Sequence, residues 1–393
     1  MDLREETLRL HRLNKGKLAT SSKVSVRTKE DLSLIYTPGV AEVCKEIGVN
    51  KNRVYDYTMK SNSVAVVTDG SAVLGLGNIG AEAALPVMEG KCVLFKELAG
   101  IDAFPICLKT QNNNEIISIV KNIEPSFGGI NLEDIAAPRC FKIEEALQDI
   151  GIPVMHDDQH GTAIVILAAL MNAAKVVNKK IEDLKVVVNG AGAAGTAITK
   201  LLLCLGIDKS ICTSVREITI CDSKGIIYEG RSDLNEFKNQ LTKITNKPRR
   251  KGALKDALEG ADVFIGVSTG NLLKADDLKK MSNNAIVFAM ANPVPEIMPD
   301  EAKKVAAIVG TGRSDFPNQI NNSLAFPGVF RGALDAKAVK INNEMQIAAA
   351  HALANCVVPT KDNILPYTLD KSIVPKIAEA VKKAAIESGV VRD

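Results

Sequence analysis

The stretch IPVMHDDQHGTAIVILAALMNAAKVVNKKIEDLKVVVNGAGAAG, residues 152–195, decides the fold. It places a short apolar, β-branched run, residues 185–189, directly before the glycine-rich turn GAGAAG. Such a run is typical of a buried parallel strand, and the glycines permit a tight turn and a close backbone approach to a pyrophosphate. The following TAITKLLLCLGI has helical spacing, so a helix N-terminus would face that anion. The pattern predicts a Rossmann-type dinucleotide domain rather than chance glycines. The residues expected at the cofactor are Gly190, Gly192, Ala193, Ala194 and Gly195.

A second predicted strand, EITICD at residues 217–222, ends on Asp222. An acid at this place could bind a ribose 2′-hydroxyl, which favours NAD because the acid would repel a 2′-phosphate. Ser223 and Lys224 follow at once and could offset that carboxylate. The cofactor is therefore predicted to be NADP or NAD, with NADP slightly favoured. The later runs ADVFIGVS, NAIVFAMANP and AAIVGTG continue the alternation of strand and helix.

The same stretch contains an acidic pair, Asp157 and Asp158, one predicted helix before the glycines. Carboxylate oxygens suit hard divalent cations such as Mg²⁺ and Mn²⁺. A hard-metal ligand this close to a dinucleotide site indicates redox chemistry on a small anion that the metal chelates.

A second glycine motif, Gly75-Leu-Gly77-Asn-Ile-Gly80, lacks a following βαβ unit with a terminal acid. We expect a tight loop that brings backbone N–H groups to the substrate or packs a helix. A second nucleotide site is the alternative.

Length and composition indicate a two-domain enzyme. The chain has 393 residues, more than one hydrophobic core usually supports. Its net charge of +3 is too small to indicate a nucleic-acid or membrane partner. The N-terminus has no apolar signal region, and the eight cysteines lack CxxC spacing. We expect a cytoplasmic protein with buried, reduced thiols.

The predicted fold class is α/β with a doubly wound Rossmann-type domain. Residues 1–158 are expected to form an α/β substrate and metal domain, and residues 159–329 the NAD(P) domain. Residues 330–393 are expected to be helices that pack back onto the first domain or the interdomain cleft.

Several motifs, in this order along the chain, resemble those of malic enzymes. They are LIYTPGVAEVC, GLGNIGAEAALPVMEGK, NLEDI, HDDQHGTA, GAGAAG, MANPVPE and NQINNSLAFPG, and they extend from about residue 10 to residue 340. The short chain is similar to the compact microbial form. The resemblance implies metal-dependent oxidative decarboxylation of L-malate to pyruvate and carbon dioxide, with reduction of NAD or NADP.

The resemblance also implies roles for single residues. Lys91 would be the general base and Tyr36 the general acid, in its own subunit or in a neighbour's within an expected homodimer. Asn292 and Asn322 would contact malate, and Asn292 the cofactor as well. Glu133, Asp134 and Asp158 would bind the metal, with Asp157 beside them.

Each role has a competing interpretation. Lys91 could be a solvated lysine at a strand edge, with Lys96 as the alternative base, and Tyr36 could be a packing residue. Asn322 could cap a turn. The neighbouring Glu133 and Asp134 can reach one ion only if the backbone turns sharply between them, because helical neighbours diverge by about 100°.

The chain departs from the family at one position. Larger malic enzymes have an arginine for a substrate carboxylate two residues before the LGLG run, where this chain has Ala72. Backbone N–H groups of residues 75–80 and asparagines would have to hold that carboxylate. A dehydrogenase of another hydroxy diacid or of an amino acid therefore stays an alternative, and a non-enzymatic dinucleotide-binding module is a more remote one.

Overall fold

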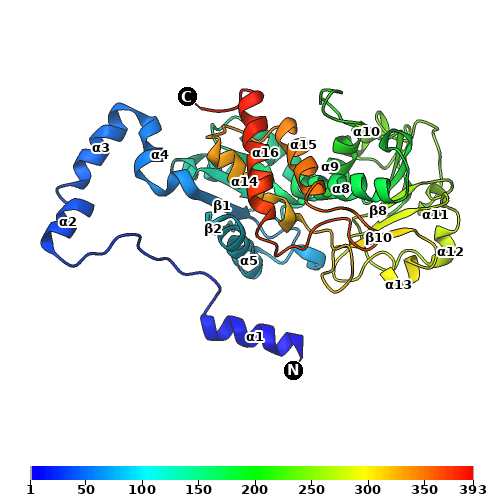
Figure 1. Ribbon diagram of the computed structural model, residues 1–393, viewed down its shortest axis with the longest axis horizontal. Coiled ribbons are helices and arrows are strands. Elements are labelled where there is room, and N and C mark those ends of the chain that lie inside the picture. The colour runs from blue at the N-terminus through cyan, green and yellow to red at the C-terminus, as the bar shows by residue number, and fades with distance from the viewer. Residues whose placement is uncertain (1, 393) are drawn as a thin grey trace.

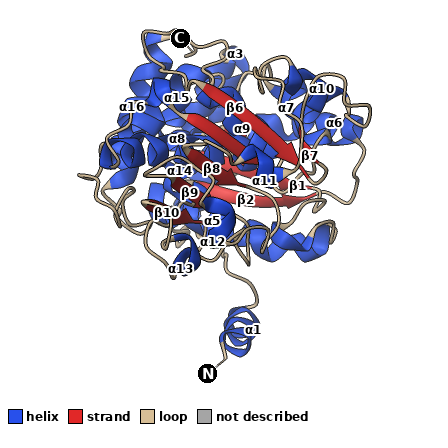
Figure 2. Ribbon diagram, turned by 90° about the vertical axis from the view of Figure 1, so that its right-hand side faces the viewer, coloured by secondary structure: helices blue, strands red, loops and turns tan. Residues whose placement is uncertain are grey.

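Two parallel β-sheets organise the computed structural model, which describes residues 2–392 (Figures 1 and 2). The first sheet has the order β2-β1-β3-β4 and is parallel throughout. Its strands are β1 (Ser63–Thr68), β2 (Asp102–Cys107), β3 (Gly129–Leu132) and β4 (Val154–His156). The apolar run VAVVT forms most of β1, an inner strand of this sheet, and all six residues of the strand are buried.

The second sheet has the order β10-β9-β8-β5-β6-β7, in which only β7 runs antiparallel to its neighbour. Its strands are β5 (Lys185–Asn189), β6 (Glu217–Asp222), β7 (Gly225–Ile226), β8 (Val263–Gly266), β9 (Ile286–Ala289) and β10 (Ile308–Thr311). The chain leaves β5 for β6 on one side and returns to β8 on the other. This reversal is the topological switch point at which doubly wound sheets bind ligands, and it confirms the predicted Rossmann-type fold.

Helices surround both sheets (Figure 2). Those on the N-terminal side are α1 (Leu3–Asn14), α2 (Lys29–Ile35), α3 (Val40–Val49), α4 (Val54–Tyr57), α5 (Ala81–Ala99), α6 (Asn113–Ile123) and α7 (Arg139–Leu147). The central and cofactor-side helices are α8 (Asp157–Val176), α9 (Ala193–Leu202), α10 (Glu236–Thr242), α11 (Leu254–Ala257), α12 (Ala275–Leu278) and α13 (Pro299–Ala302). The C-terminal helices are α14 (Phe326–Asp335), α15 (Asn343–Ala354) and α16 (Ile373–Glu387).

The long helix α8 joins the two sheets through the largest core cluster. Its middle residues are almost continuously buried, as expected of a helix that is apolar on all sides. It packs against α9 and α15, while α14 and α16 contact α5. The C-terminal helices therefore pack back onto α5 of the first domain and onto α8, which confirms that they pack back onto the body of the chain. The predicted domain boundaries at residues 158 and 329 stay a proposal.

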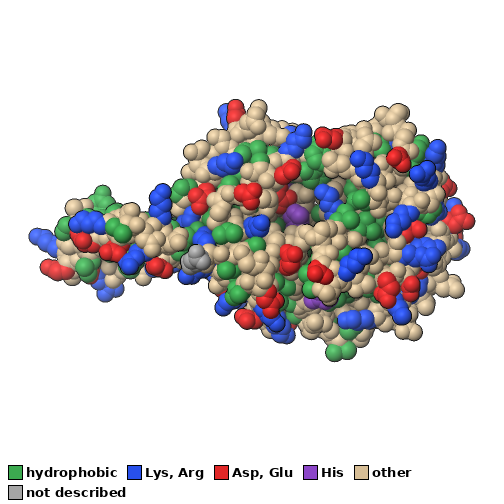
Figure 3. Space-filling model, turned by 90° about the horizontal axis from the view of Figure 1, so that it is seen from above, with side chains coloured by type: hydrophobic (Ala, Val, Ile, Leu, Met, Phe, Trp, Pro, Cys, Tyr) green, Lys and Arg blue, Asp and Glu red, His purple; other side chains and the backbone are tan. Residues whose placement is uncertain are grey.

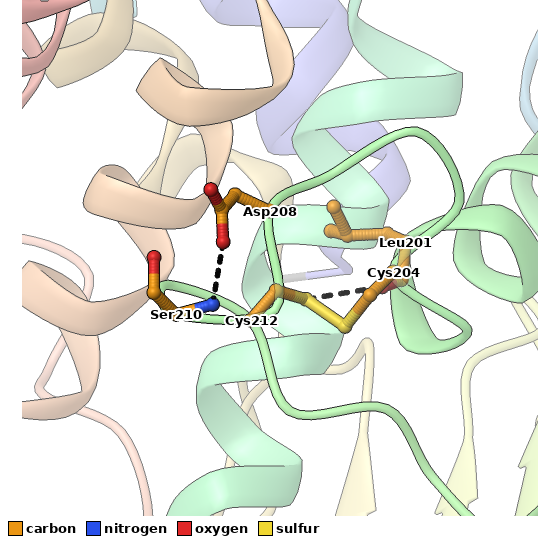
Figure 4. Close-up of a disulfide and its surroundings, with 5 residues drawn as sticks. All are labelled: Leu201, Cys204, Asp208, Ser210 and Cys212. Carbon is orange, nitrogen blue, oxygen red and sulfur yellow. Dashed lines mark hydrogen bonds between the residues drawn. A yellow bond between two sulfur atoms is a disulfide. The ribbon is translucent and has the colours of Figure 1, made fainter.

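The prediction that all eight cysteines are reduced is wrong for two of them. Cys204 and Cys212 form a disulfide with Cα atoms 5.9 Å apart (Figure 4). Cys204 takes the left-handed conformation, with φ of 51°, as the chain turns out of α9. The turn brings back a cysteine eight positions further along the chain, a proximity that no CxxC motif signals. The other six cysteines are free.

The N-terminal segment extends away from the rest of the chain as an arm, residues 2–59, in which no residue is buried (Figures 1 and 3). Large apolar side chains are nevertheless common on it, including Leu34 at 76% exposure and Val49 at 90%. The segment just after α1 contacts α5, where the Lys17 ammonium donates to the Pro86 carbonyl at 2.6 Å. Within residues 2–392, no helix is long and apolar enough to cross a membrane.

Candidate active site

Three carboxylates meet where β3 and β4 end. Glu133 and Asp134 follow β3 and Asp158 lies in the first turn of α8, so parallel pairing brings them to one edge of the first sheet. One oxygen from each lies within 4.8 Å of the others. Asp134 has φ of 53°, and this left-handed backbone is the sharp turn that lets neighbouring acids face one point. The Asp134 amide also donates to Asp158 Oδ2 at 2.8 Å.

Lys91 projects from α5 to this cluster. Its ammonium lies 2.6 Å from Asp157 Oδ2 and 3.0 Å from Glu133 Oε1, and it lies over the Phe326 ring. Lys91 is therefore a buried helical residue rather than a solvated residue at a strand edge. Lys96, the alternative base, instead pairs with Asp102 outside the cluster.

The charges around Lys91 determine its protonation. Burial alone would lower the pKa of Lys91, but Asp157 and Glu133 outweigh burial and raise it above its usual value. Burial raises the pKa of Glu133 well above its usual value and also raises that of Asp157. The buried ammonium of Lys91 is therefore stabilised by the two carboxylates that contact it.

Asp157 has a larger structural role than the sequence indicated. Its Oδ2 accepts from Lys91 and, at 2.7 Å, from the Asn322 side-chain amide. Asn322 thereby joins the cluster from the turn that precedes α14. A Cβ at residue 161 would lie 1.8 Å from Asp157 Oδ1, so a larger residue there would displace the Asp157 carboxylate.

The glycine-rich turn that was predicted to hold a pyrophosphate lies at the switch point, between β5 and α9. Gly190 has φ of 121°, and a Cβ on it would lie 2.5 Å from the Val267 carbonyl. A Cβ on Gly195 would lie 1.7 Å from the Gly190 carbonyl, whereas a Cβ on Gly192 would meet nothing within 4 Å. Gly190 and Gly195 therefore permit the turn, and Gly192 leaves open space before the N-terminus of α9. Ala193 and Ala194 begin that helix, where backbone N–H groups suit a pyrophosphate.

Asp222 at the end of β6 is held by two cations that sequence analysis missed. Arg231 and Lys238 both pair with its Oδ2, the latter at 2.7 Å. Burial alone would raise the pKa of Asp222, but these donors lower it to about 2. Lys224 pairs instead with Asp233 and is largely exposed. Neither Arg231 nor Lys238 belongs to a motif, so only their proximity in the fold reveals them.

A cavity of about 320 Å³ connects the glycine-rich turn to Asp222. Its lining includes Gly190, Gly192, Asp222, Ser223 and Lys238. Residues 137, 138 and 141 of the first domain close its other side. The cavity therefore lies between the parts of the chain that carry the two sheets.

The second glycine motif forms a tight loop, as predicted. It contains a short 3₁₀ turn, and Gly80 precedes α5. A Cβ on Gly75 would lie 2.5 Å from the Asn292 carbonyl, so this loop touches the cofactor domain. Asn292 is exposed there, after β9. Beside Ala72, the Arg139 guanidinium pairs with Asp69 at 2.6 Å and also donates to Ser71.

The structure does not bring Tyr36 to the cluster. Tyr36 follows α2 on the arm, is 67% exposed, and lies far from α5 in the same chain (Figure 1). The arm that carries it projects from the body (Figure 3). The remaining predicted catalytic and metal-binding residues gather without it.

Comparison with known proteins identifies the family. Residues 15–148 match the malic enzyme N-terminal domain, and residues 159–386 match the malic enzyme NAD-binding domain. The bifunctional malic/malolactic enzyme of Bacillus subtilis is 58% identical over 398 residues, which cover 100% of this chain and 95% of that protein. The NAD-dependent malic enzyme of Geobacillus stearothermophilus is 54% identical, over 96% of this chain and 78% of its own. The crystal structure of an NAD-dependent malic enzyme from Thermotoga maritima has a TM-score of 0.92 and 51% identity, over 97% of this chain and 99% of that one. The chain therefore belongs to the malic enzyme family of NAD(P)-dependent oxidoreductases.

Proposed function

We propose that the chain catalyses the oxidative decarboxylation of L-malate to pyruvate and carbon dioxide with NADP or NAD and a divalent cation, Mg²⁺ or Mn²⁺. The observation that carries this proposal is the convergence of Glu133, Asp134 and Asp158 beside Lys91. An all-oxygen donor set suits a hard cation. A bound cation would polarise the C2 oxygen of malate and stabilise the charge that develops there on decarboxylation.

Lys91 is the proposed general base for the C2 hydroxyl. It must first give up its own proton, and Asp157, in direct contact with it, is the group placed to receive that proton. The raised pKa of Asp157, caused by burial, makes this transfer less costly than it would be to an exposed carboxylate. Asn322 keeps Asp157 oriented and is proposed, with Asn292 and backbone N–H groups of residues 75–80, to hold malate in place of an arginine at position 72.

Tyr36 is the proposed general acid toward C3, acting from a second copy of the chain. The support is twofold: the arm carries Tyr36 away from its own Lys91, and it exposes apolar side chains such as Leu34 and Val49. A symmetric homodimer would bury these side chains and exchange the two tyrosines between sites. From a net charge of only +3 and an aromatic content of 4%, we propose that the enzyme has no nucleic-acid or membrane partner. We also propose that it is cytoplasmic.

The proposed cofactor is NADP, with NAD also accepted. Arg231 and Lys238 neutralise Asp222, so the carboxylate no longer repels a 2′-phosphate. Lys238 and Ser223 both line the cavity beside Asp222 and could donate to that phosphate. We therefore propose that Lys238, rather than the largely exposed Lys224, binds the 2′-phosphate of NADP.

The test is an assay of reduced cofactor, pyruvate and carbon dioxide from malate, with Mn²⁺ and each cofactor supplied in turn. Chelation should abolish turnover and Mn²⁺ should restore it. Asp158→Asn should raise the Mn²⁺ concentration for half-maximal activity by about 10-fold or more, the scale seen even for residues that only support metal ligands. Asp149→Asn, on the exposed surface, is the matched control. Turnover without any divalent cation would exclude the proposed chemistry.

A further inference from the structure

An aromatic contact joins the two domains at the cofactor cavity. The ring of Phe141, on α7, lies 4.9 Å from the ring of Phe237, on α10, measured between centroids, and their planes are tilted by 39°. The Lys142 Nζ atom, also on α7, lies 5.8 Å from the centroid of the Phe237 ring. Because α7 packs against α6 and β4 of the first domain, both contacts connect that domain to the cofactor domain.

Helix α10, which contains Phe237, also contains Lys238, the residue proposed to bind the 2′-phosphate. Phe237 immediately precedes Lys238, and Leu241, at the far end of α10, is the only residue of this helix that is buried. The Lys238 ammonium lies 2.7 Å from Asp222 Oδ2, beside the cavity that both residues line. The position of Lys238 relative to the cavity therefore depends on what holds the first turn of α10.

We infer that Phe141 is a positioning residue for NADP, which acts by holding Phe237 and thereby fixing Lys238 beside the ribose of the cofactor. This inference rests on the proposed reading of the 2′-phosphate by Lys238. It makes cofactor choice in one domain depend on a side chain of the other. Phe141, Phe237 and Lys238 all line the cavity of about 320 Å³.

The test is a titration of the protein with NADPH or NADH in the absence of substrate and metal. Binding is measured by the fluorescence of the reduced nicotinamide. Phe141→Leu removes the ring and keeps an apolar side chain. It should weaken NADPH binding by about 2- to 12-fold relative to NADH binding, the range that aromatic pairs contribute. Phe141→Tyr keeps the ring and should retain the parental preference. Phe237→Leu removes the same contact from the other side and should repeat the effect.

Controls separate positioning from general damage. Phe104→Leu disrupts a ring pair with Phe127, whose centroids are 6.0 Å apart within the first domain, and should leave both affinities unchanged. In a Lys238→Ala background, Phe141→Leu should have no further effect on NADPH binding, because the residue that Phe141 positions is gone. The inference would be overturned if Phe141→Leu weakened the binding of NADPH and NADH equally. It would also be overturned if Phe141→Leu weakened NADPH binding as much in the Lys238→Ala background as in the parent.

The outcome also separates this inference from the proposed function. If Lys238→Ala weakens NADPH binding but Phe141→Leu does not, the positioning role is wrong and the phosphate-reading role stands. If Lys238→Ala leaves NADPH binding unchanged, the phosphate-reading role fails, and the positioning role fails with it.

Discussion

Asp157 connects the proposed base to the substrate side of the site. It contacts Lys91 and Asn322 through one oxygen, and its other oxygen faces Gly161 one helical turn later. A helix normally disfavours glycine by about 1 kcal/mol relative to alanine. Glycine at this position therefore lowers the intrinsic stability of α8 and leaves the space that the carboxylate needs.

Gly161→Ala should consequently reduce activity although alanine is the better helix former. The added Cβ would lie 1.8 Å from Asp157 Oδ1, so the carboxylate must move and carry Lys91 with it. A displacement of about 1 Å at a reacting group can reduce the rate by about 100-fold, and we expect kcat to fall on that scale. Glu379→Ala, at an exposed position of α16, is the control for a change of helix residue alone. Parental kcat in Gly161→Ala would show that Asp157 tolerates displacement.

At the scale of secondary structure, the elements with strong local patterns were predictable. The strands β5 and β6 begin and end at the residues that the sequence indicated, because a β-branched run and a following glycine turn define them locally. The link between Lys238 and Asp222 was not predictable, because an irregular connection, residues 227–235, separates β7 from α10. The Cys204–Cys212 pairing depends likewise on a left-handed turn after α9 that no local motif marks.

The disulfide should stabilise the loop that follows α9. Closing a loop of this length removes chain entropy worth about 2–3 kcal/mol in the unfolded state. Cys204→Ser should therefore lower the free energy of unfolding by that amount in urea titrations under oxidising conditions. Dithiothreitol should reproduce the loss in the parent and have no effect on the variant. Cys44→Ser, which replaces an exposed free thiol, should match the parent. If dithiothreitol leaves the unfolding free energy of the parent unchanged, the disulfide does not contribute to stability.

The ion pairs of Asp222, at the end of β6, with Arg231 and Lys238 predict a pH dependence. The folded pKa of Asp222 is about 2, below the ordinary value of 3.8, so the native state binds fewer protons between these limits. The stability from this group is present above about pH 4 and is lost as the pH falls through about 2. The difference in unfolding free energy between the parent and Asp222→Asn should shrink over that window. A difference that stays constant there would exclude a depressed pKa.

At the scale of the whole molecule, the sequence predicted a catalytic tyrosine and lysine but not the distance between them. Tyr36 and Lys91 belong to separate motifs, and each motif is recognisable by itself. Their separation follows from the arm, residues 2–59, whose lack of buried residues reflects missing tertiary contacts rather than local propensity. Apolar positions in a sequence indicate burial, but they do not indicate which chain buries them.

Mixing two inactive variants should therefore restore activity. In a dimer that pairs Tyr36→Phe with Lys91→Ala, one site receives both intact residues and the other receives neither. Random exchange of equal amounts should recover about a quarter of the parental activity, since half of the twofold dimers are mixed and each has one complete site. Each variant alone, refolded in the same way, is the control. If the mixture shows no gain over the separate variants, Tyr36 serves its own chain or has no role in protonation.

The exposed arm has a further consequence for how the enzyme must be handled. If the acid of each site comes from the neighbouring copy, turnover per chain depends on protein concentration through mass action. Progressive dilution should then reduce specific activity while circular dichroism still reports a folded chain, because the body of each chain retains its own core. Adding back an inactive Lys91→Ala chain would supply the missing tyrosine and slow that loss, so a catalytically dead protein would act as an activator.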